Sequence, residues 1–158
     1  MIGVGNALRH DDAAGLETAR ALRARAERER LSVHEQEGEC LGLLEQWHGA
    51  AGAVLVDAVQ SGARNAATPG RVRRLDASAT ALATGLSSSS THAFGLAEAV
   101  ELARSLGRLP QRVVVYGIEG RCFSAGVGLS AEVRAAIPAL ADAVLDEALR
   151  IRAAVTAR

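Results

Sequence analysis

Two adjacent carboxylates, Asp11 and Asp12, follow a glycine turn near the start of the chain. Residues 3–12 read Gly-Val-Gly-Asn-Ala-Leu-Arg-His-Asp-Asp, and a helical pattern begins soon after them. The glycine spacing is similar to that of a nucleotide-binding loop, but Leu8 stands where G-x-G-x-x-G needs its third glycine. A phosphate at a helix N-terminus also disfavours neighbouring negative charge. The turn is therefore interpreted as one part of a cation-binding site, to which other segments would add the remaining ligands.

Two further side chains of metal-binding type occur later in the chain. Asp57 interrupts the apolar run 53–59, and His92 stands at the start of a helical pattern. Ligands bind where the carboxyl ends of parallel strands meet. We therefore expect Asp12, Asp57 and His92 to lie at one edge of a sheet. Two carboxylates and an imidazole suit nickel or zinc better than magnesium, and three ligands leave coordination positions open.

Each of these residues also has an ordinary structural interpretation. A lone strand-end aspartate such as Asp57 often caps a loop or accepts backbone N–H bonds, because an unpaired buried carboxylate is costly. A histidine at a helix N-terminus, such as His92, is often only solvated. For His10 we expect an exposed loop side chain, with a contact to substrate or to a metal ligand as the alternative. What favours a metal site is that all three residues are expected at the same edge of the sheet, where its parallel strands end.

Strand and helix patterns alternate along the chain. Strands are expected at 2–5, 31–37, 53–59, 71–76 and 112–117, and helices at 15–30, 41–48, 92–106 and from 131 onwards. This alternation predicts an α/β fold, a mostly parallel sheet with helices on both faces. The arginine-rich segment 71–76 suits a half-exposed edge strand. Ser130 is expected to cap the last helix, and Pro138 to kink or divide it. The segment 77–90 is either low-complexity or a substrate-facing loop.

Composition narrows the possible partners. The 158 residues carry 18 basic and 18 acidic side chains, so no net charge favours nucleic acid or an anionic membrane. We expect one domain, 1–158, and no apolar run is long enough to cross a bilayer. Cys40 and Cys122 lack metal-type spacing and are interpreted as small, buried, reduced thiols of a cytoplasmic protein. The first strand is short, so we expect the natural chain to begin upstream of Met1.

The ordered set of motifs resembles the hydrogenase maturation endopeptidases over nearly the whole chain. It comprises residues 5–12, 56–59, 91–96, 117–120 and 128–130. The resemblance implies a three-layer α/β/α sandwich around a mainly parallel, five-stranded sheet. It also implies an endopeptidase that removes the C-terminal extension of a [NiFe] hydrogenase large-subunit precursor after nickel insertion. Asp12, Asp57 and His92 would then contact nickel that the precursor presents, rather than a resident cofactor.

Two segments depart from the family's pattern. Ala13 stands where the family often has glycine after the acidic pair, which changes no ligand. The loop at 37–40 reads Glu-Gly-Glu-Cys where a Gly-Gly-Thr-like sequence is frequent. Glu37 and Glu39 would either recognise the substrate or be solvated. Cys40 has no convincing histidine base nearby in the sequence, so a nucleophilic role is disfavoured.

The sequence leaves more than one mechanism and more than one function open. Nickel would have one of three roles: it would polarise the carbonyl of the cleaved bond, activate a water molecule, or only serve to recognise the substrate. As an alternative, Asp12 or Asp57 would act as the general base. A non-catalytic nickel- or precursor-binding chaperone is the main alternative function. A peptidase of similar fold with another substrate comes next, and a nucleotide-binding domain is least favoured. A degenerate or mis-started copy with little activity is the remaining alternative.

Overall fold

The structure is a computed structural model that describes residues 1–37, 42–60, 68–78 and 91–157, with the side chains of 91–94 excepted. In chain order its elements are β1 (Ile2–Gly5), the 3-10 helix η1 (His10–Ala13), α1 (Ala14–Arg28), β2 (His34–Glu37), α2 (Leu43–Gln46), β3 (Gly52–Val59), β4 (Val72–Asp76), α3 (Thr91–Ser105), β5 (Arg112–Glu119) and α4 (Ala131–Thr156).

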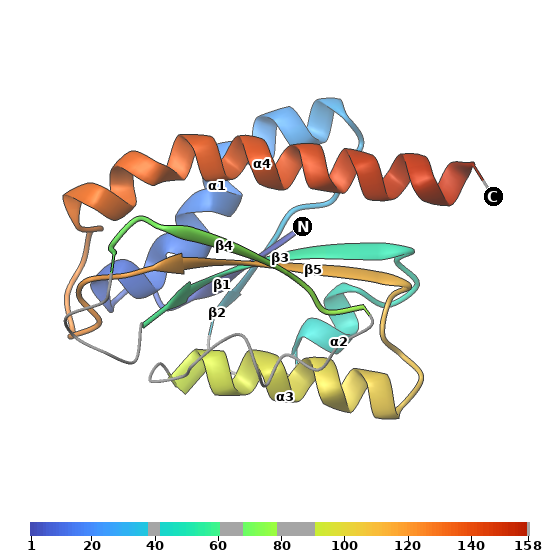
Figure 1. The fold of residues 1–158 in the computed structure, drawn as a ribbon, viewed down its shortest axis with the longest axis horizontal. Coiled ribbons are helices and arrows are strands. Elements are labelled where there is room, and N and C mark those ends of the chain that lie inside the picture. The colour runs from blue at the N-terminus through green and yellow to red at the C-terminus, as the bar shows by residue number, and fades with distance from the viewer. Residues whose placement is uncertain (38–41, 61–67, 79–90, 158) are drawn as a thin grey trace.

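The described strands form one five-stranded sheet in the order β2-β1-β3-β5-β4. β2, β1, β3 and β5 run parallel, and β4 pairs antiparallel with β5 at the edge. Figure 1 shows α1 and α4 over one face of the sheet and α2 and α3 over the other. The α/β/α sandwich is thereby confirmed, as is the edge position of the arginine-rich strand. The single-domain organisation and the cytoplasmic location stay predictions.

Alternation along the central strands divides the core into two layers. Leu55 and Val115 belong to the cluster that packs under α2 and α3. Val54 and Val114 belong to the cluster that packs under α1 and α4. Because β3 and β5 are buried on both faces, they read as nearly continuous apolar runs, as parallel strands do. No described helix is both long enough and apolar enough to cross a membrane.

The last helix differs from expectation at Pro138. α4 continues through this proline as one helix, so of the two alternatives, a kink or a division, the division is wrong. Ile137 and Leu140 on either side of it are 8% and 2% exposed. Their burial in the core holds both parts of the helix on the sheet, which offsets the hydrogen bond that the proline ring removes.

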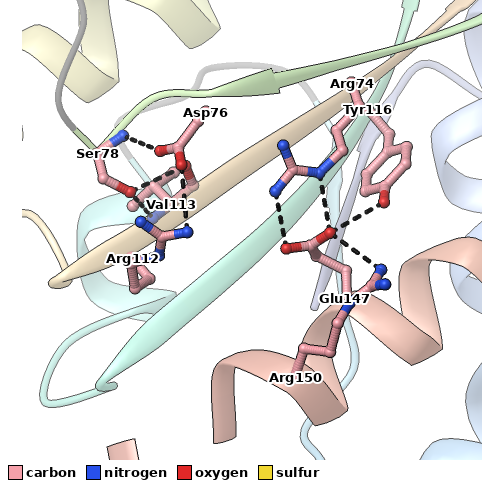
Figure 2. Close-up of polar contacts among 8 residues, drawn as sticks. All are labelled: Arg74, Asp76, Ser78, Arg112, Val113, Tyr116, Glu147 and Arg150. Carbon is pink, nitrogen blue, oxygen red and sulfur yellow. Dashed lines mark hydrogen bonds and ion pairs between the residues drawn. The ribbon is translucent and has the colours of Figure 1, made fainter. Parts of the chain in front are cut away.

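Polar side chains join α4 to the antiparallel edge of the sheet. Figure 2 shows Glu147 of α4 between Arg74 of β4, Tyr116 of β5 and Arg150. Both carboxylate oxygens of Glu147 accept a hydrogen bond from Arg74, at 2.9 Å each, and Tyr116 donates its hydroxyl at 3.3 Å. The Arg74 hydrogen bonds, which outweigh burial, hold the pKa of Glu147 below its ordinary value. Glu147 is thus a buried charge with several donors, as burial of a carboxylate requires.

Candidate active site

Asp12 is held at the carboxyl edge of the sheet by close backbone packing. A Cβ on Gly5 would overlap the carbonyl oxygen of Asp12, and a Cβ on Gly15 would overlap the carbonyl oxygens of Val4 and Val56. Only glycine permits such approaches, so α1 begins directly on the backbone of β1 and β3. η1, which carries Asp12, contacts β3 as well. The Asp12 residue is 1% exposed.

Asp57 lies near the end of β3, the neighbouring strand. It is 1% exposed and pairs in register with Gly117 of β5. By alternation its side chain belongs to the same face as Leu55 and Val59, the face covered by α2 and α3. The structure therefore brings Asp12 and Asp57 to the ends of two adjacent parallel strands, as expected from the sequence.

His92 is the second residue of α3. In Figure 1 α3 begins on the side of the molecule to which the arrowheads of β3 and β5 point. The side chain of His92 lies outside the described part of the structure. Among the described residues, no group of three or more His, Cys, Asp and Glu side chains is arranged to hold a metal ion. The three-residue metal site stays a prediction.

The carboxylate of Asp11 binds a distant loop by hydrogen bonds. Its carboxylate accepts hydrogen bonds from the N–H groups of Arg121 and Cys122, at 2.8 and 2.9 Å. Ser130 donates both its N–H, at 2.7 Å, and its hydroxyl, at 2.9 Å. Burial alone would raise the pKa of Asp11, but these hydrogen bonds outweigh it and hold the pKa below its ordinary value. Asp11 therefore anchors the loop 120–130 beside the candidate site.

His10 joins the same loop to the opening turn. Its N–H donates to the carbonyl of Gly126 at 3.0 Å, and its Nδ1 lies 3.1 Å from the carbonyl oxygen of Gly128. A Cβ on Gly126 would overlap the imidazole ring, so the two chain segments pack closely. His10 is half-buried, with φ 49°. The expected exposed loop histidine is wrong, because the ring is packed between two segments that are distant in sequence.

The cysteine predictions have a mixed outcome. Cys122 is a free thiol, as expected, but it is half-buried rather than buried. Its Sγ lies 3.2 Å from the hydroxyl of Ser124 on a surface loop. Cys40 and Glu39 lie outside the described residues, and Glu37 is exposed at the end of β2.

Glu119 is a further buried carboxylate at this edge, and the sequence interpretation left it without a role. It ends β5 opposite Val59, is fully buried, and lies on the face of Asp57 by alternation. Its carboxylate accepts hydrogen bonds from the N–H of Thr68 at 2.8 Å and from Nε of Arg73 at 2.9 Å. The signal that pointed to Asp57, an acidic residue inside an apolar run, also applies to Glu119.

The fold and these residues define an α/β/α sandwich protein whose candidate site lies at the carboxyl ends of parallel strands. A family model described as HycI, hydrogenase maturation protease, matches residues 38–147. The chain belongs to this hydrogenase maturation protease family, and its activity class is that of a peptidase of hydrogenase maturation. The matched range includes Asp57 and His92 but not Asp12, so the placement of Asp12 comes from the geometry of the opening turn.

Solved structures support the same assignment. The hydrogenase maturating endopeptidase HybD from E. coli is 26% identical, with 94% of this chain and 90% of that chain covered and a TM-score of 0.72. The [NiFe] hydrogenase maturation protease HybD from Thermococcus kodakarensis is 26% identical, with 95% of both chains covered and a TM-score of 0.67. HycI from the same organism, at 19% identity, 92% and 88% coverage and a TM-score of 0.67, shows the shared fold. No curated protein matches the sequence.

Proposed function

We propose that this protein removes the C-terminal extension of a [NiFe] hydrogenase large-subunit precursor after nickel has been inserted, with that nickel as the recognition element. The observation that carries the proposal is the pair of buried carboxylates, Asp12 and Asp57, on adjacent strand ends of a maturation protease fold. The HybD relative from Thermococcus kodakarensis is described as a [NiFe] hydrogenase maturation protease, which supports this substrate class.

Asp12, Asp57 and His92 are the proposed contacts to the nickel that the precursor presents. Carboxylate oxygen and imidazole nitrogen form a donor set that suits a borderline divalent ion. Charges at this buried edge are poorly screened by water, so two carboxylates attract a cation there more strongly than they would on the surface. The contact would position the precursor's cleaved bond at the strand ends and make cleavage depend on metal loading.

The peptide bond is hydrolysed with water as the second reactant. Asp12 or Asp57 would take the proton of that water as a general base, provided that it comes within hydrogen-bonding reach. Nickel, when bound, supplies a positive charge able to polarise the carbonyl of the cleaved bond. Asp11 is not a candidate base, because its oxygens accept hydrogen bonds from the loop and its pKa is held low.

The test is processing of an extended large-subunit precursor, with and without prior nickel loading, followed by intact mass. We expect the extension to be lost only from the nickel-loaded precursor. Asp12→Asn, Asp57→Asn and His92→Ala should each abolish processing. Asp146→Asn, the same change at an exposed position of α4, should process normally.

Three other results would change the proposal. Cleavage of both precursors would keep the peptidase and discard nickel as the recognition element. Binding of the nickel-loaded precursor without cleavage would favour the chaperone alternative. Normal processing by Asp12→Asn would remove Asp12 from the site.

A further inference from the structure

A groove of about 700 Å³ adjoins the candidate site on the face that α1 and α4 cover. We call it the apolar groove. Most of its lining is apolar, and the apolar residues include Ala7, Ala13, Ala21, Val127, Ile137 and Pro138. Three charged residues, Glu17, Arg20 and Arg134, also line it. Ile137 is buried in the core, so the floor of the apolar groove is continuous with the packed interior. Ala13 directly follows Asp12, so the groove begins one residue away from the proposed nickel contact.

Two large apolar side chains stand exposed beside this groove. Val127 and Leu8 are 72% and 67% exposed, more than any other large hydrophobic side chain in the described part of the chain. Gly126 donates its N–H to the carbonyl of Leu8 at 2.9 Å, so the loops that carry the two side chains lie together. A single exposed leucine is ordinary, whereas neighbouring apolar side chains beside an apolar groove indicate a binding surface.

The apolar groove is built before any partner arrives. His10 donates its backbone N–H to Gly126 at 3.0 Å, and the carboxylate of Asp11 accepts hydrogen bonds from Cys122 and Ser130 on either side of Val127. The two loops are therefore tied together by hydrogen bonds between segments more than 100 residues apart. A surface held in this way loses little conformational freedom on binding, which favours affinity.

We propose that the apolar groove, with Leu8 and Val127 at its rim, binds apolar side chains of the precursor segment that flanks the cleaved bond. The inference rests on the proposed function. The precursor is the occupant because Ala13, which lines the groove, directly follows Asp12, and nickel held at Asp12 brings the precursor chain to this turn. A peptidase needs such contacts to hold the cleaved bond in place next to its catalytic groups.

The test compares processing kinetics of the nickel-loaded precursor by wild type, Leu8→Asp and Val127→Asp. We expect each variant to raise KM at least tenfold with little change in kcat, because an aspartate in the groove opposes burial of apolar side chains. Leu106→Asp is the matched control, since Leu106 is 56% exposed and directly follows the last residue of α3. It should leave KM unchanged. Leu8→Ala and Val127→Ala, which keep the surface uncharged, should raise KM about two- to fivefold.

The outcomes separate this inference from the proposed function. If the wild type processes the precursor and Leu8→Asp and Val127→Asp have the same KM as the wild type, the proposed role of the groove is refuted and the proposed function stands. No processing by wild type would refute the proposed function and the groove with it. Sedimentation velocity adds a further check: a dimer of wild type that Val127→Asp dissociates and Leu106→Asp does not would assign the groove to a second copy of the chain instead.

Discussion

Asp11 accepts two hydrogen bonds from Ser130, although 119 residues separate them. Ser130 is the N-cap residue of α4, but its hydroxyl makes no capping hydrogen bond to the helix. The expected N-cap position of Ser130 is confirmed, but its hydroxyl donates to a buried carboxylate instead of the helix, because a charge-assisted hydrogen bond is stronger than a neutral one. The start of α4 is thereby bound to the turn that carries the proposed nickel contact.

Asp11→Asn should lower the free energy of unfolding by about 1 to 3 kcal/mol. The amide presents an NH₂ group in place of one acceptor oxygen, so a buried donor loses its partner. Urea denaturation, followed by fluorescence of the single tryptophan Trp47, measures the change; this side chain is 2% exposed in the folded protein. Asp146→Asn, the same change at an exposed position of α4, should change stability by less than about 0.5 kcal/mol. Equal stability of Asp11→Asn and wild type would remove the anchoring role.

The same carboxylate predicts a pH dependence. The pKa of Asp11 lies below its ordinary value of 3.8, so its contribution to stability is present above that pH and is lost as pH falls through the folded-state pKa. Urea denaturation across this acidic range should show wild type losing stability more steeply than Asp11→Asn. Parallel curves for the two proteins would contradict the prediction.

Tyr116, the single tyrosine of the chain, should titrate above 10.0. Burial raises the pKa of its hydroxyl, and the negative charge of Glu147, to which the hydroxyl donates, raises it further (Figure 2). Phenolate absorbance measures this titration directly. Glu147→Gln should lower the pKa towards its ordinary value, whereas Glu132→Gln near the start of α4 should not. A wild-type tyrosine that titrates at or below 10.0 would show that the contact is not maintained in solution.

Gly15→Ala should destabilise the protein by about 3 kcal/mol and impair processing. The added Cβ overlaps the carbonyl oxygens of Val4 and Val56, so the start of α1, and Asp12 with it, must move. Gly49→Ala is the control. That residue has φ 71° and open space around it, so the same change should cost only about 1 kcal/mol of backbone strain and leave processing intact. Normal stability and processing of Gly15→Ala would show that the close approach is not required.

The sequence by itself determined the alternation of elements, the arginine-rich edge strand and the buried aspartate Asp57 near the end of a central strand. These features are local. A strand buried on both faces must be apolar throughout, so one aspartate inside it is conspicuous. The helix after the opening turn was predictable from its period, and the ordered motifs indicated the maturation protease family that the comparisons confirm.

Only the tertiary structure decided how the two adjacent aspartates divide their roles. Asp11 and Asp12 are chemically identical, and what separates them is the turn of η1, which points Asp11 at a loop 110 to 119 residues away. Distant segments that meet at the end of the sheet also decide the packing of His10 and the hydrogen bond from Arg73 to Glu119. Periodicity reports which side of an element is buried, whereas a polar partner is chosen by loops that meet only after the chain has folded.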